Sequence, residues 1–149
     1  MIDSQELEQT LGAGFGALFH PYFDGLARGQ LAIPRCTACG RHQFPPRSVC
    51  VHCRGHDFAW DVADDPRGTL FTWTVVHHAK GTEFEALAPY AVALISLAQF
   101  DVRLYGLIPE PEGLEVGASV RLVFPSPDGE VPAGSSTVGR PHWVHANPD

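Results

Sequence analysis

All four cysteines of the chain lie in one short stretch, as two pairs with the same internal spacing. Cys36 and Cys39 form the first pair, Cys50 and Cys53 form the second, and ten residues separate the pairs. Four thiolates are the ligand set of a closed, tetrahedral structural zinc site. We therefore predict that these cysteines bind one zinc ion and that the two Cys-x2-Cys turns face each other as a zinc ribbon.

The main alternative for a Cys-x2-Cys pair is a redox-active dithiol. That chemistry needs a helix N-terminus in a βαβ context, and neither pair has one. A closed four-sulfur site leaves no position for water, so the expected zinc is structural and folds about 25 residues that lack an adequate core. His42 and His52 lie beside the cysteines, but four sulfurs already fill the shell. Gly40 and Gly55 are expected to supply the positive φ angles of the turns.

Charge is distributed unevenly along the 149 residues. The formal net charge is −7, which opposes a general role in binding nucleic acid. The stretch from Arg28 to His56 nevertheless holds five arginines and no acidic residue. Most of these arginines are expected to offset the charge of the zinc thiolates, and Arg47 is the one chosen to meet ligand phosphates. The start of the chain shows no signal peptide and no apolar run reaches membrane length, which predicts a cytoplasmic protein.

The period of the apolar residues changes from helical to strand-like along the chain. Helical spacing predicts a helix over Leu18–Arg28, with Pro21 in its first turn and Gly29 just after its end. This helix is apolar over much of its girth and must pack against its own domain or a partner. Residues 3–11 carry a weak helix-start signal, and the glycines that follow are expected to end that helix. Strands are predicted at 68–78, 89–97, 102–108 and 119–124, with a fifth near 141–145.

These elements predict a mainly β protein made of an N-terminal helix, a zinc ribbon and a small antiparallel barrel. The expected division is 1–30 for the helical segment, 31–58 for the ribbon, 59–124 for an OB-fold barrel, and 125–149 for an irregular tail that completes the barrel or not. Loops are expected at 79–88 and 125–139. Established catalytic templates are missing: no nucleophile accompanies His77 and His78, and Lys80 lacks the glycine loop of a phosphate-binding site.

The residues resemble a known family. The pieces FDGLARGQL, RCTACGRHQFPPRSVCVHC, RGTLFTWTVVH and PYAVALISL, followed by a strand ending at Phe124, are similar in order and spacing to the domain of unknown function 35 family. This resemblance implies a rubredoxin-like zinc ribbon plus an OB-fold. It also implies a partner of thiolase-like enzymes that act on acyl-CoA in steroid or aromatic degradation. The tail beyond Pro125 is longer than the family pattern.

We therefore expect a non-catalytic, zinc-containing accessory subunit of a thiolase, acyltransferase or aldolase that makes or breaks a carbon–carbon bond of a CoA thioester. It would form a hetero-oligomer with the thiolase-like subunit and contribute to acyl-CoA binding, with Arg47 and Lys80 as the CoA-binding candidates. Two alternatives remain open: a nucleic-acid-binding module, because ribbons and OB-folds both occur in such proteins, and a stand-alone acyl-CoA carrier.

Overall fold

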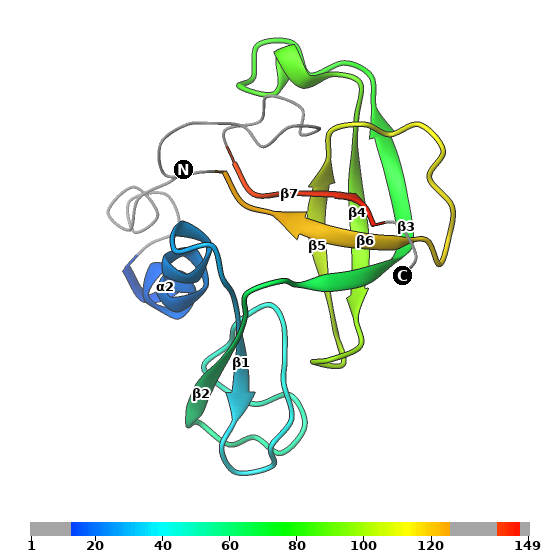
Figure 1. Ribbon diagram of the computed structural model, residues 1–149. Helices are drawn as coiled ribbons and strands as arrows, with labels where there is room; N and C mark the ends of the chain where they lie inside the picture. The colour runs from blue at the N-terminus through cyan, green and yellow to red at the C-terminus, as the bar shows by residue number, and fades with distance from the viewer. Residues whose placement is uncertain (1–12, 126–139, 147–149) are drawn as a thin grey trace. The chain divides into compact units, whose positions relative to one another are not determined.

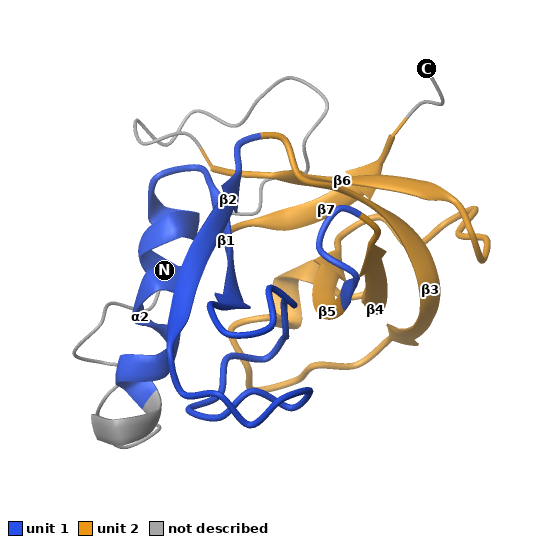
Figure 2. Cartoon of the chain, turned by 90° about the horizontal axis from the view of Figure 1, so that it is seen from below, with its two compact units in different colours: residues 1–64, 99–102 blue, residues 65–98, 103–149 orange. Residues whose placement is uncertain are grey.

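The computed structural model describes residues 13–125 and 140–146, in two compact units (Figures 1 and 2). Unit 1 comprises residues 1–64 together with the short segment 99–102, and unit 2 comprises residues 65–98 and 103–149. The helix-start signal at residues 3–11 and nearly all of the expected 125–139 loop lie outside the described residues. None of the described helices is both long enough and apolar enough to cross a membrane.

The first element of unit 1 that the structure describes is helix α2, which spans Ala13–Ala27. Its C-terminus is closed by hydrogen bonds from the Gly29 N–H to the Leu26 carbonyl (3.2 Å) and from the Gln30 N–H to the Gly25 carbonyl (2.9 Å). This pair of bonds is a Schellman motif, and Gly29 provides its left-handed residue with φ of 73°. The prediction of Gly29 as the residue after the helix is confirmed.

The predicted start of this helix was wrong. Helix α2 begins at Ala13, so Pro21 lies in its interior and not in its first turn. Gly14 and Gly16 are also part of the helix, although glycine was expected to end helical structure here. Helix propensity is a weak influence that packing overrides, and the Leu26 side chain of this helix is buried.

Two strands follow in unit 1, β1 over Leu31–Cys36 and β2 over Phe58–Ala63. They pair antiparallel, with Leu31 opposite Ala63 and Cys36 opposite Phe58. Leu31, Ala32 and Ile33 are buried and form the apolar base of the unit. Cys36, the first predicted zinc ligand, is therefore the last residue of β1. The other three cysteines lie in the loop that connects the end of β1 to the start of β2.

Unit 2 is built around a five-stranded antiparallel sheet with the order β5-β4-β3-β6-β7. The strands are β3 (Arg67–Val76), β4 (Tyr90–Leu97), β5 (Val102–Ile108), β6 (Ser119–Val123) and β7 (His142–His145). All five predicted strands are present. Strand β3 is long enough to pair with β6 over Arg67–Thr69 and with β4 over Thr69–Val76, and its register with β4 shifts between Leu70 and Thr72.

The sheet curls so that its two edge strands approach each other. A Cβ atom added to Gly106 of β5 would lie 2.2 Å from the indole of Trp143 of β7, so the ring sits directly on the glycine backbone. Trp143 is almost fully buried, together with Leu70, Ile95 and Leu104. Among the described residues no hydrogen-bonded ladder joins β5 to β7. The expected barrel is thus an open OB-type sheet whose seam is filled by side-chain packing.

The loop between β3 and β4 is ordered by local contacts. It contains a short 3-10 helix, η1, over Glu85–Leu87. Arg140, just before β7, donates a hydrogen bond to Glu83 (2.8 Å) and lies 4.5 Å from the centre of the Phe84 ring. The hydrogen bond from Arg140 lowers the pKa of the Glu83 carboxyl. The predicted polar loop at 79–88 therefore exists, and Arg140 holds it next to the start of strand β7.

Candidate metal centre

The four cysteine sulfurs converge in unit 1. All four Sγ atoms lie within 4.8 Å of one another. The Sγ–Sγ distance is 3.6 Å between Cys36 and Cys53 and 3.7 Å between Cys39 and Cys50. A tetrahedral zinc ion with Zn–S bonds of about 2.3 Å requires sulfurs about 3.8 Å apart. Cys36 and Cys50 are buried, and Cys39 and Cys53 lie nearer the surface. The geometry and the donor set both fit a structural zinc ion.

Two equivalent backbone turns place these sulfurs. The Cys36 N–H donates to the Arg41 carbonyl (2.9 Å), and the Cys50 N–H donates to the Gly55 carbonyl (2.8 Å). Each first cysteine also accepts a hydrogen bond at its carbonyl, from the Gly40 N–H and the Arg54 N–H respectively. The two pairs are thus related by the same local fold, as two knuckles that face a common point.

The two knuckles use different residue types at the position with a positive φ angle. Gly40 has φ of 73°, as predicted, whereas the matching residue of the second knuckle is Arg54, with φ of 63°. The prediction that Gly55 supplies a positive φ was wrong. Gly55 is needed for space: a Cβ there would lie 3.2 Å from the Cys36 sulfur and 3.3 Å from the Cys53 sulfur. A side chain at this position would press on the metal ligands.

The thiols of the metal-free cluster titrate unequally. Burial raises the pKa of the Cys50 thiol, but hydrogen bonds from the backbone at Cys53 and His52 more than offset it and lower this pKa to about 7. The backbone N–H of Gly55 favours the Cys53 thiolate, yet sharing protons with the thiols of Cys36 and Cys39 raises its pKa to about 12. A metal ion must displace these shared protons, so metal binding at this centre releases protons.

The rings of His42 and His52 contact other side chains and not the sulfurs, and His52 Nδ1 lies 3.0 Å from Arg41. His42 Nε2 lies 2.8 Å from Asp61 Oδ2, and the same oxygen accepts a hydrogen bond from Arg35 Nε at 2.9 Å. The hydrogen bonds from His42 and Arg35 lower the pKa of the Asp61 carboxyl. The His42 ring also makes an edge contact with Phe100, which belongs to the 99–102 segment of unit 1. Asp61 thus ties strand β2 to β1 and to the loop after the first knuckle.

Gln43 is a residue of the site that sequence analysis missed. It is buried, and its side-chain oxygen accepts a hydrogen bond from the Val51 N–H (3.0 Å). Its amide nitrogen donates to the Val49 carbonyl (3.4 Å). The Gln43 side chain therefore holds the start of the second knuckle against the end of the first. Its neighbours in the sequence, His42 and Phe44, form no pattern that marks Gln43 as buried, and its hydrogen-bond partners are set by the loop conformation.

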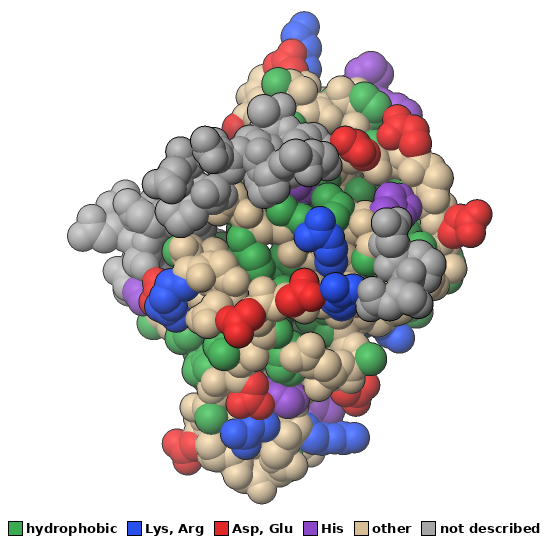
Figure 3. Space-filling view, in the orientation of Figure 1, with side chains coloured by type: hydrophobic (Ala, Val, Ile, Leu, Met, Phe, Trp, Pro, Cys, Tyr) green, Lys and Arg blue, Asp and Glu red, His purple; other side chains and the backbone are tan. Residues whose placement is uncertain are grey.

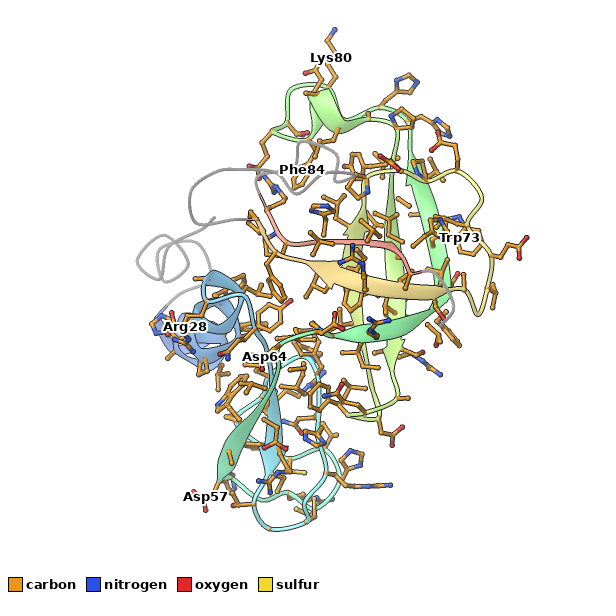
Figure 4. The ribbon with its side chains drawn as sticks, viewed as in Figure 1. Arg28, Asp57, Asp64, Trp73, Lys80 and Phe84 are labelled. Atoms are coloured by element: carbon orange, nitrogen blue, oxygen red, sulfur yellow. The ribbon has the colours of Figure 1, made fainter. Side chains whose placement is uncertain are left out.

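The five arginines of the acid-free stretch have different environments. Arg35 is paired with Asp61, and Arg41 lies 3.0 Å from the His52 ring. The guanidinium groups of Arg28, Arg47 and Arg54 are exposed, and Figure 4 places Arg28 at the end of α2. Figure 3 shows basic and histidine side chains on the surface of the ribbon. The stretch therefore presents exposed positive charge to solvent, while its Arg35 pairs with Asp61 of strand β2.

Arg47 borders a groove of about 500 Å³ in unit 1. The groove is lined by Leu18, Phe19, Pro45, Pro46, Arg47, Ser48, Val49, Cys50 and Val51. Its walls are mostly apolar, and the Phe44–Pro45 peptide bond beside it is cis. Lys80, the other CoA-binding candidate, lies in unit 2 at the exposed tip of the β3–β4 loop and points away from the sheet (Figure 4). The structure therefore places the two candidates in separate units.

The described residues hold one group of His, Cys, Asp or Glu side chains that could bind a metal, the four cysteines. His77 and His78 are exposed after the end of β3. The fold and the cysteine cluster together define a protein of the zinc-ribbon and OB-fold class.

Comparison with known proteins gives the family. Residues 23–59 match the model described as the ChsH2 rubredoxin-like zinc ribbon domain, and residues 60–125 match the model described as the ChsH2 C-terminal OB-fold domain. The chain belongs to the domain of unknown function 35 (DUF35) family, as the resemblance in the sequence implied. The predicted fold class is confirmed by the same matches.

Relatives have been described from archaea. The chain is 36% identical over 92 residues to a DUF35 domain-containing scaffold protein of Methanocaldococcus jannaschii, and the match spans 60% of this chain and 64% of that protein. It is 29% identical over 99 residues to a scaffold protein of the same description from Methanothermobacter thermautotrophicus, across 65% of this chain and 73% of that one.

Two solved structures share the fold. One is a chain of the Ltp2–ChsH2(DUF35) aldolase, with a TM-score of 0.62 and 31% identity over 70% of this chain and 81% of that chain. The other is a DUF35 protein of unknown function from Sulfolobus solfataricus, with a TM-score of 0.55 and 21% identity over 70% of this chain and 75% of that chain.

Proposed function

We propose that this protein is a zinc-containing, non-catalytic accessory subunit of a thiolase-like enzyme, an aldolase or thiolase, acting on an acyl-CoA thioester. The observation that carries the proposal is the similarity to a chain of the Ltp2–ChsH2(DUF35) aldolase, which extends over 81% of that chain at 31% identity. The scaffold description of the archaeal relatives supports the same role. A fully ligated zinc ion offers no open coordination position for substrate, so the metal would be structural.

The subunit would hold the complex together and contribute to the binding of the CoA thioester. Arg47 borders an apolar groove, and an exposed guanidinium is suited to a phosphate group. Lys80 is a second exposed cation on a loop. The carbon–carbon bond chemistry would belong to the partner subunit, with a substrate from steroid or aromatic degradation. Reduced cysteines in two metal-binding pairs fit a cytoplasmic location.

Co-purification tests the assembly. The tagged full-length protein is expressed in its native host, and proteins that elute with it in fixed stoichiometry are identified by mass spectrometry. We expect a thiolase-fold subunit and one zinc per chain. Recovery of the protein without such a subunit would contradict the proposal, and salt-dependent binding of single-stranded nucleic acid would favour the rival class of function.

Binding of the thioester is tested on the purified complex. Arg47→Ala and Lys80→Ala are each expected to raise the KM or Kd for the CoA thioester with little change in kcat, because a charge contact far from the reacting carbon is lost. Arg28→Ala, at another exposed arginine just after the end of α2, is the control. Unchanged binding in both variants would remove these residues from the site. Tight CoA binding by the isolated subunit would instead indicate a carrier.

A further inference from the structure

One face of the sheet in unit 2 is exposed and carries apolar side chains on three strands, with Thr72 and Thr74 lying beside them opposite Leu94 and Val92. It is formed by outward-pointing residues of strands β3, β4 and β5, and we call it the outer sheet face, defined by Phe71, Val92, Leu94, Arg103 and Tyr105. Three of its side chains are exposed hydrophobic groups: Tyr105 is 75% exposed, Phe71 44% and Val92 37%. Isolated surface hydrophobics are ordinary, but a contiguous group on neighbouring strands marks an interaction site.

Register and contacts show that these residues share one face. On β4 the inward residues Ala91, Ala93 and Ile95 are buried, so Val92 and Leu94 point outward between them. Arg103 of β5 donates a hydrogen bond to Ser96 of β4 (3.1 Å), which sets it on the same side. Tyr105 follows two residues later on the same strand and therefore has the same orientation.

Arg103 joins the strands of this face together. Its guanidinium carbon lies 3.9 Å from the centre of the Phe71 ring, a cation–π contact that reaches from β5 across to β3. The hydrogen bond to Ser96 fixes the same side chain over the intervening strand β4. Arginine held flat on an aromatic ring keeps its remaining N–H groups free to bind a carboxylate. The face therefore presents an ordered cation with exposed aromatic groups beside it.

The charge of this face contrasts with the rest of the chain. The chain has 17 acidic and 10 basic residues, yet strands β3, β4 and β5 contain no aspartate or glutamate. Tyrosine, phenylalanine and arginine are the residues enriched at the centres of protein interfaces, where acidic residues are depleted. A symmetric pair of such faces would offer Arg103 no carboxylate and would bring together two chains of net charge −7. The complementary surface is thus apolar with a carboxylate at its edge, on a different protein.

We propose that the outer sheet face is the surface on which the thiolase-like subunit docks, with Tyr105 and the Phe71–Arg103 pair as its central contacts. This inference rests on the proposed function, since it names the surface that the accessory subunit uses. A single-stranded nucleic acid would also stack on exposed aromatics, but such a groove tracks the phosphates with several cations and this face holds one.

The test measures the affinity of purified variants for the purified thiolase-like subunit. Tyr105→Ala and Arg103→Ala should each weaken the complex at least tenfold, because each removes a contact that becomes desolvated on docking. Val116→Ala is the matched control: Val116 is a similarly exposed hydrophobic side chain (71%) of the same unit, outside the face. It should leave the affinity within about twofold. Zinc content and thermal unfolding show that each variant is folded.

The outcomes separate this inference from the proposed function. If the wild-type protein binds the subunit and both face variants bind equally well, the docking surface is elsewhere while the accessory role stands. If the wild-type protein forms no complex with a thiolase-like subunit, the proposed function fails and the docking surface with it. A third outcome is that the wild-type protein binds single-stranded DNA and that Tyr105→Ala abolishes this binding while leaving the complex with the thiolase-like subunit intact. In that case the face serves nucleic acid and the inference is overturned.

Discussion

Replacing Cys50 with serine removes the buried sulfur of the first cysteine in the second knuckle. We expect zinc content to fall from one ion per chain to nearly none, since a serine hydroxyl is a poor substitute for a thiolate in a four-sulfur site. Metal analysis of the dialysed protein measures the loss. His52→Ala is the control, because that ring contacts Arg41 and should leave zinc in place. Full zinc occupancy in the serine variant would exclude Cys50 as a ligand.

Asp61 is expected to contribute to stability through its charge. Its side chain is 38% exposed, so the value of its contacts with His42 and Arg35 is reduced by solvent. We expect Asp61→Asn to lower the free energy of unfolding by about 1 kcal/mol. Chemical denaturation of the zinc-loaded proteins at neutral pH measures this difference.

The same pair of proteins gives a pH dependence. Asp61 has a folded-state pKa below the unfolded value of about 3.9, so its stabilisation is fully present above that unfolded value. It is lost as the pH falls through the lower folded-state pKa, because the protonated carboxyl no longer attracts its partners. The stability difference between wild type and Asp61→Asn should therefore vanish in acid. A difference that stays constant below pH 4 would mean that charge is not the cause.

Side-chain partners of this kind could not be predicted from the sequence. The cysteine cluster was predictable because its spacing is local and the chemistry of thiolates is specific. Asp61 lies 26 residues from Arg35 and 19 from His42, and only the pairing of β1 with β2 brings them together. The positive φ of Arg54 was missed for a similar reason, since a glycine one position later was available to explain the turn.

At the level of strands, the seam between β5 and β7 depends on one glycine. In Gly106→Ala the new methyl group would collide with the indole of Trp143 and approach Ile95 at 3.0 Å. Overpacking of this kind costs about 1–3 kcal/mol, and we expect a loss within that range. Thermal unfolding monitored by Trp fluorescence measures it.

A second substitution tests whether the collision is the cause. Gly106→Ala should cost less in a Trp143→Phe background than in the wild type, since the smaller ring leaves room for the methyl group. The comparison of single and double variants gives this coupling directly. Equal costs in the two backgrounds would show that Gly106 is required for backbone reasons and not for the indole.

The strands of unit 2 were predictable to within two residues because they are rich in β-branched and aromatic residues. Strands β1 and β2 were not predicted, since β1 contains Pro34 and each has six residues. A short segment that contains a proline forms a strand only when a partner strand pairs with it, as β2 does with β1. Whether the barrel closes could not be decided from the sequence, because strand pairing at the edges depends on twist and curl that local sequence does not encode.

At the level of the molecule, removing zinc should affect the two units differently. Unit 2 has its own core of Leu70, Ile95, Leu104 and Trp143, whereas unit 1 relies on few buried apolar side chains around its cysteines. We expect a strong chelator to make residues 36–58 sensitive to protease while the sheet of unit 2 stays protected. Limited proteolysis with mass spectrometry maps the cuts, and restoring zinc should reverse the effect. Simultaneous digestion of both units would show that they unfold together.

Residues 99–102 give unit 1 a discontinuous sequence. The chain leaves this unit at residue 64 and contributes to it again 35 residues later, where Phe100 meets the ring of His42. A gene cut after codon 64 would therefore encode a ribbon without one of its own packing residues. A chimaera that takes only residues 1–64 from a relative would likewise lack that relative's residue at the position of Phe100. Evolution is expected to conserve the two halves as one inherited block, and engineered chimaeras should keep the tip of the β4–β5 hairpin from the same parent as the ribbon.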